Sequence, residues 1–171
     1  MQISTPNAKE KDKYRYIILP DLAASIQHSD LLHVKVKACH DVYIALINGE
    51  SENDQLYEVV LGGWNNSKSV LRTHKQQQPA VRTSVGSVLD CTRFKEFVIK
   101  WTYSTINIVL STNRGNSYIL RWWTQTKLNP IKNVGVYTGF GSTGEWIFDY
   151  KAGSILIFQI LITLIMVNTR N

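Results

Sequence analysis

The chain has 171 residues, of which 44% are apolar and 19% are charged. This balance is typical of one folded domain and excludes a disordered chain. The net charge of +6 is dispersed, apart from KEKDKYR at residues 9–15, so it predicts a solvated basic surface and no nucleic-acid partner.

The start of the chain gives few structural signals. Residues 1–13 are polar and are expected to form a flexible N-terminus. No signal peptide is visible, because no apolar run follows the first Met, and we therefore expect a cytoplasmic chain. Residues 14–19 alternate weakly, and residues 21–27 predict one helical turn capped by Asp21.

From residue 32 onward the pattern is that of strands. Residues 32–38, LHVKVKA, alternate apolar and polar side chains, which predicts a half-buried antiparallel strand. Further strand patterns follow at a spacing of roughly 8–12 residues: 41–47, 56–61, 69–73, 80–89, 94–102, 105–111, 117–124, 133–138 and 145–150. Helical periodicity is almost absent. We predict an all-β fold, an antiparallel two-sheet β-sandwich that is jelly-roll-like, over residues 14–150.

Two corners rich in glycine and tryptophan interrupt these strands. The first reads GGWNN at residues 62–66, and the second reads TGFGSTGEW at residues 138–146. Paired glycines allow positive φ or the close approach of another group, and a bulky aromatic directly behind them is unusual at a strand end. These corners are the strongest functional signal in the chain.

The two cysteines, Cys39 and Cys91, lie in or beside strand patterns and away from any metal-spaced histidine. We expect both to be small buried apolar groups, while a disulfide between them is the alternative that the sequence leaves open. No metal site is predicted, because none of the four histidines has metal-ligand spacing.

The apolar tail, residues 151–171, has an uncertain status. Its core at residues 155–167, ILIFQILITLIMV, is shorter than the roughly 20 residues of a spanning helix. Three interpretations stay open: a sequence foreign to the domain, a final buried strand, or a tail anchor or glycolipid-anchor signal. Membrane contact is expected only through this segment.

Several strings, taken together and in order, resemble one invertebrate family, the domain named after farnesoic acid O-methyltransferase. They are LHVKVKACHDVYIAL, YEVVLGGWNNSKSVLR, FVIKWTY and YILRWWTQTKLNPIKNVGVYTGFGSTGEW, and the resemblance covers about residues 32–150. Val98 departs from the aromatic pair that is usual in the family, and residues 155–167 have no counterpart in it.

The family name implies transfer of a methyl group from S-adenosylmethionine to farnesoic acid, which gives methyl farnesoate in the juvenile-hormone pathway. Gly139, Gly141 and Gly144 match the GxGxxG spacing of a nucleotide loop, but a strand pattern follows them where that loop needs a helix. In this alternative, Arg72 or Arg121 would hold the substrate carboxylate. Whether the chain is an enzyme stays open, and no catalytic residue is assigned.

Our leading hypothesis is a non-catalytic recognition module without a cofactor, whose partner is a carbohydrate, a small amphipathic molecule or a protein. We expect Arg72 to pair with Glu58 across a hairpin, and one of Trp122 and Trp123 to be buried and the other exposed. The residues NNS at 65–67 form an N-glycosylation sequon, which we expect to be idle in a cytoplasmic chain. The candidate ligand contacts are Trp64, Asn65, Asn66, Arg72, Trp122, Trp123, Gly141, Glu145 and Trp146.

Overall fold

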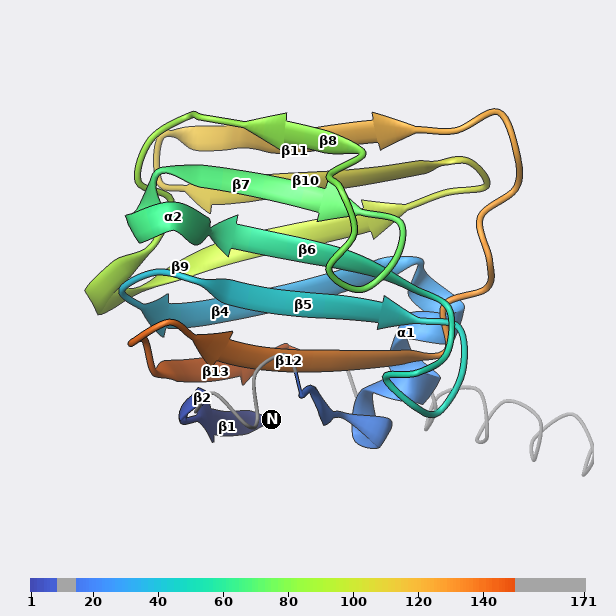
Figure 1. Ribbon diagram of the computed structural model, residues 1–171, viewed down its shortest axis with the longest axis horizontal. Coiled ribbons are helices and arrows are strands. Elements are labelled where there is room, and N and C mark those ends of the chain that lie inside the picture. The colour runs from blue at the N-terminus through green and yellow to red at the C-terminus, as the bar shows by residue number, and fades with distance from the viewer. Residues whose placement is uncertain (9–14, 150–171) are drawn as a thin grey trace, which may run out of the picture.

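A computed structural model describes residues 1–8 and 15–149 and shows two packed β-sheets (Figure 1). The first sheet runs in the order β1 (Gln2–Thr5), β13 (Gly144–Phe148), β4 (Leu31–Ala38), β9 (Asp90–Trp101), β10 (Thr105–Thr112) and β11 (Gly115–Trp123). The second runs in the order β2 (Asn7–Ala8), β12 (Asn133–Gly139), β5 (Val42–Ile47), β6 (Leu56–Gly62), β7 (Lys68–Arg72) and β8 (Val81–Thr83), and β3 (Ile17–Ile18) also pairs with β12. All described pairs are antiparallel except the short β2–β12 pair, so the predicted β-sandwich is confirmed.

The main core lies between the two sheets. In β4, buried and half-buried residues alternate along the whole strand, as the sequence predicts. Strands β5, β6 and β12 are instead buried along their whole length. Their outer face carries a second apolar cluster that includes Tyr16, Tyr43 and Tyr137, and this explains why their sequences are nearly continuous apolar runs.

The N-terminal part differs from the prediction. Residues expected to be loose form β1, which pairs with β13, and Thr5 is buried there. The helical turn is present as a 3₁₀ turn (Pro20–Leu22) followed by α1 (Ala23–Ser29), but Asp21 does not cap it. Of the pattern at residues 80–89, Val81–Thr83 pairs as a strand. A strand's partner lies far away in the sequence, so local composition did not show these pairings.

Residues 155–167 lie outside the described part of the chain. In the part that the structure describes, no helix is long and apolar enough to cross a membrane.

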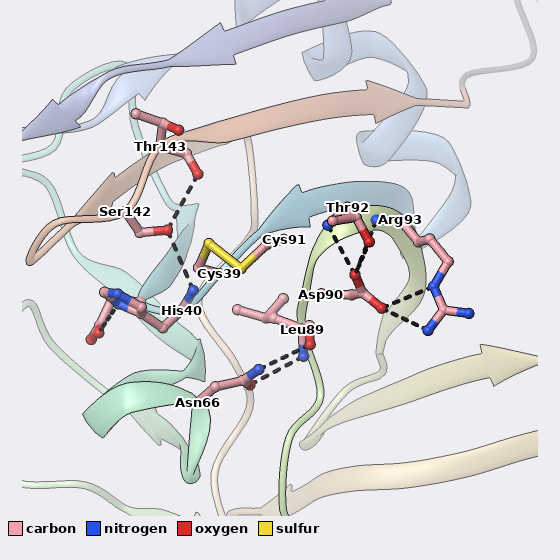
Figure 2. Close-up of a disulfide and its surroundings, with 11 residues drawn as sticks. Cys39, His40, Asn66, Leu89, Asp90, Cys91, Thr92, Arg93, Ser142 and Thr143 are labelled. Atoms are coloured by element: carbon pink, nitrogen blue, oxygen red, sulfur yellow. Dashed lines mark hydrogen bonds and ion pairs between the residues drawn. A yellow bond between two sulfur atoms is a disulfide. The ribbon is translucent and has the colours of Figure 1, made fainter.

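Cys39 and Cys91 form a disulfide, so the expectation of two buried thiols was wrong (Figure 2). Cys39 directly follows β4, Cys91 is the second residue of β9, and the neighbouring pair Ala38 and Asp90 are partners in the sheet. Both cysteines are exposed. The disulfide closes a separation of 52 residues next to the first corner.

Candidate functional site

The two Gly/Trp corners meet at one end of the sandwich, where α2 (Gly63–Asn66) and the β12–β13 turn both lie at the left in Figure 1. The backbone of Asp41 links them. Its N–H donates to the carbonyl of Gly62 at 2.9 Å, and its carbonyl accepts from the N–H of Gly139 at 3.4 Å. The strand that follows Asp41 runs between β6 and β12, so both corners are held at its start.

The first corner is a left-handed turn. Trp64, Asn65 and Asn66 have φ of 53°, 57° and 60°, and Gly62 before them has φ of 58°. A side chain on Gly62 would also collide with Leu89 and Asn66, so only glycine fits this position. Three successive non-glycine residues at positive φ are costly, and such backbone strain is characteristic of functional sites.

The two asparagines of this turn have different roles. The side chain of Asn66 accepts from the N–H group of Val88 at 3.0 Å. It also accepts from the N–H group of Leu89 at 3.1 Å and donates to the carbonyl of Leu89 at 2.9 Å (Figure 2). It therefore fastens the corner to the segment before β9. Asn65 is exposed, and within the described residues its side chain has no hydrogen bond.

A pocket of about 470 Å³ opens beside this turn. Trp64 and Phe140 are its exposed aromatic walls, and 50% and 47% of their surfaces are accessible to solvent. The second corner thus contributes Phe140, which has φ of 56°. The residues that line the pocket are Asp41, Tyr43, Trp64, Asn65, Arg72, Gln76 and Phe140.

Asp41 supplies a buried carboxylate to this pocket. Burial raises the pKa of Asp41, and the hydrogen bonds from His40 and from the Trp64 backbone N–H oppose this rise. The distance from His40 Nδ1 to the carboxylate is 2.8 Å. Ser142 Oγ accepts from the backbone N–H of His40, not from its ring, so the three side chains do not form a proton relay.

Arg72 enters the pocket from β7. It forms an ion pair with Glu58, as predicted from their positions on the hairpin, and Glu58 is fully buried. Glu58 also accepts from the hydroxyl of Tyr16 at 2.7 Å and from the backbone N–H of Gln76 at 3.1 Å. Burial and the nearby Glu58 carboxylate raise the pKa of Tyr16. Arg72 Nε is buried and has no hydrogen-bond partner among the residues described.

The other predicted site residues lie elsewhere. Trp122 is half-buried and packs against the core beside Tyr57, and Trp123 is 69% exposed on the outer face of the first sheet, so the two side chains lie on opposite faces as predicted. Trp146 is fully buried, and its Nε1–H donates to Thr5 Oγ1 at 2.8 Å.

Two further candidates also lie outside the lining of the pocket. Glu145 forms an ion pair with Lys37 at 2.7 Å on the first sheet. Within the second corner, the N–H of Gly141 donates to Asn7 Oδ1 at 2.9 Å. The structure therefore brings together Trp64, Asn65 and Arg72 from the predicted set.

Sequence reasoning missed four residues that line the pocket: Asp41, Tyr43, Gln76 and Phe140. Phe140 lies between two glycines of the second corner, and this local pattern could have identified it as a site residue. Gln76 lies in the loop between β7 and β8, which passes in front of β6 in Figure 1, and nothing local marks it.

The Gly139–Gly144 turn does not fit a nucleotide cofactor. It joins strand β12 to strand β13, and no helix N-terminus follows it. Gly144 is packed so tightly that an added Cβ would lie 2.7 Å from Thr5 and 2.9 Å from the Trp146 indole nitrogen. The absence of a side chain at position 144 therefore allows the neighbouring strands to pack closely. No group of three or more potential metal ligands occurs within residues 1–8 and 15–149.

The fold and the pocket define a jelly-roll-like β-sandwich with an aromatic-walled pocket at one end. Galectin LEC-6 of Caenorhabditis elegans resembles it with a TM-score of 0.52 at 9% identity, over 87% of this chain and 96% of that chain. Bacillus licheniformis β-glucanase resembles it with a TM-score of 0.50 at 11% identity, over 88% and 78%. At these identities the likeness shows the fold alone.

The family model for farnesoic acid O-methyltransferase matches residues 10–152, and the chain belongs to this family. The resemblance noted over about residues 32–150 is thereby confirmed and extended toward the N-terminus. No curated protein matches the chain in sequence.

Proposed function

We propose that this domain is a non-catalytic recognition module that binds a carbohydrate in the pocket between α2 and the β12–β13 turn. The observation that carries the proposal is Trp64, a half-exposed indole held at the pocket by a left-handed turn. Exposing a large aromatic side chain on a strained backbone is costly, and a ligand that stacks on the indole explains why the arrangement exists.

The mixture of walls and polar groups suits a sugar ring. A pyranose has apolar C–H faces, which Trp64 and Phe140 would cover, and hydroxyls at its edge. Asp41 accepts hydrogen bonds, the guanidinium of Arg72 donates them, and the amide of Asn65 does both. The galectin and β-glucanase likeness supports the architecture only, so the choice of a carbohydrate rests on the pocket.

The test is a glycan array with the purified chain, followed by calorimetric titration of each sugar that binds. Trp64→Ala should weaken binding at least tenfold, which corresponds to about 1.4 kcal/mol. Trp123→Ala is the matched control, because this tryptophan is also exposed but lies on the other sheet and outside the pocket. Equal losses in both variants, or no binding by the folded protein across the array, would contradict the proposal.

The family name supports a second candidate, methylation of farnesoic acid with S-adenosylmethionine. Arg72 lies in the pocket, but Glu58 already neutralises its charge, and Arg121 lies on the first sheet, stacked on Tyr118. Neither arginine is therefore a free carboxylate clamp. Calorimetry with S-adenosylmethionine and an assay for methyl farnesoate separate the candidates, and we expect neither binding nor product.

A further inference from the structure

The exposed asparagine of the first corner carries a second signal. Asn65, Asn66 and Ser67 read N-N-S, which is an acceptor sequence for N-linked glycans. Asn65 is exposed and lines the pocket, whereas the neighbouring Asn66 is tied to Val88 and Leu89 by three hydrogen bonds. Thus the acceptor asparagine is the one whose amide the fold leaves in solvent.

The disulfide between Cys39 and Cys91 is an independent observation that also indicates a compartment where N-linked glycans are attached. Structural disulfides form and persist in oxidising compartments such as the lumen of the endoplasmic reticulum and are rare in the cytosol. The acceptor sequence has a meaning only in that compartment. The disulfide therefore favours the secretory route, in contrast to the cytoplasmic location expected from the sequence.

We propose that Asn65 is an N-glycosylation site and that its glycan covers the carbohydrate pocket. In the reaction, Asn65 Nδ2 forms a bond to the anomeric carbon of an oligosaccharide carried on a lipid diphosphate. The bond from that carbon to the diphosphate oxygen breaks, the lipid diphosphate leaves with the electron pair, and Nδ2 loses one proton to a base of the transferase. The co-reactant is the lipid-linked sugar donor of the secretory route.

The fold indicates when this modification occurs. In the folded turn the hydroxyl of Ser67 donates to the carbonyl of Trp64 at 2.6 Å, and Asn65 has φ of 57°. The hydroxyl of the acceptor sequence is thus already engaged once α2 has formed. We place glycan transfer before this turn closes, on the chain as it enters the compartment.

The consequence for the pocket follows from where Asn65 lies. Its amide lines the same pocket as Trp64 and Phe140, so the first attached sugar lies at the mouth between the two corners. It would occupy the position of a free ligand or block its entry. This part of the inference rests on the proposed function, while the modification itself does not.

The modification is tested by directing the full chain into the endoplasmic reticulum of cultured eukaryotic cells with an added leader. Secreted and cell-retained protein are pooled and analysed by intact mass and by peptide mapping after peptide N-glycosidase treatment, which converts glycosylated Asn65 to Asp. We expect a glycan that Asn65→Gln and Ser67→Ala remove and that Ser67→Thr retains. Asn116→Gln, at an exposed asparagine outside any acceptor sequence, should leave it unchanged. Protein with the disulfide formed but without a glycan at Asn65 would overturn the inference.

The effect on the pocket is tested by calorimetry with sugars selected on the array. Unmodified protein made in bacteria with the disulfide formed should bind them at least about tenfold more tightly than the glycosylated form. Equal affinity would overturn the covering role and leave the modification in place. If the unmodified protein binds no sugar, the proposed function and the covering role both fail, while the mass measurement still decides whether Asn65 is modified.

Discussion

Asp41 is the residue that joins the parts of the site. Its backbone bonds to both corners, and its carboxylate is buried at the pocket beside His40 and the Trp64 N–H. Burial of this carboxylate does not by itself stabilise the folded state, because burial destabilises its charged form. In the proposed function, Asp41 would accept hydrogen bonds from the ligand, and its bonds to His40 and Trp64 limit the cost of its burial.

This placement predicts a pH dependence of stability. The pKa of Asp41 is raised from its ordinary value of 3.8, mainly by burial, so the folded chain binds this proton more tightly than the unfolded chain. The stabilising contribution is present below pH 3.8 and is lost as pH rises through the raised pKa. In urea unfolding, the free energy of unfolding of the wild type minus that of Asp41→Asn should therefore fall with increasing pH. A difference that increases with pH would contradict the burial argument.

At the scale of elements, the left-handed turn α2 depends on what is packed around it. Asn66 fastens it to the segment directly before β9, and the disulfide fastens the start of β9 to the residue after β4 (Figure 2). The turn, the start of β9 and Cys39, two residues before Asp41, thus form one connected unit. The pocket wall that carries Trp64 belongs to this unit.

Removal of the disulfide should loosen the unit. Replacing both Cys39 and Cys91 by Ser is expected to lower the free energy of unfolding by about 2–5 kcal/mol, because the unfolded chain loses a crosslink across 52 residues. Urea unfolding followed by fluorescence measures this change. Reduced wild-type protein is the control and should behave like the double variant. An unchanged midpoint in both would show that the crosslink does not constrain the chain.

At the scale of the whole molecule, the first residues complete the sandwich. Strand β1 pairs with β13, which otherwise would be an edge strand, and the hydroxyl of Thr5 accepts from buried Trp146. An exposed edge strand is a template for aggregation. The short β1 therefore stabilises the sandwich and also prevents β13 from pairing with another chain.

Deletion of residues 1–8 tests this role. Thr5→Val is the matched control; it leaves the Trp146 N–H without its acceptor and should cost about 1–3 kcal/mol. The deletion should lower the free energy of unfolding further than Thr5→Val and should increase light scattering on heating, because it also uncovers β13. If the deletion costs no more than Thr5→Val, β1 contributes only one hydrogen bond.

The features of the fold that depend on neighbouring residues could be predicted from the sequence. Alternation of side chains is a property of neighbouring residues, so the half-buried strand at residues 32–38, the opposite faces of Trp122 and Trp123 and the Glu58–Arg72 pair were all correct. The corners were recognised for the same reason, since glycine followed by a bulky aromatic is a local pattern.

Contacts between distant segments explain what could not be predicted. The disulfide joins residues 52 positions apart, β1 pairs with the last described strand, and Asp41 brings together corners separated by about half of the domain. Which strand lies beside which is set by the burial of both sheets at once, not by any short window of sequence. The residues thus specify the strands and the unusual corners, while folding of the whole sandwich makes one pocket of Trp64, Asp41 and Phe140.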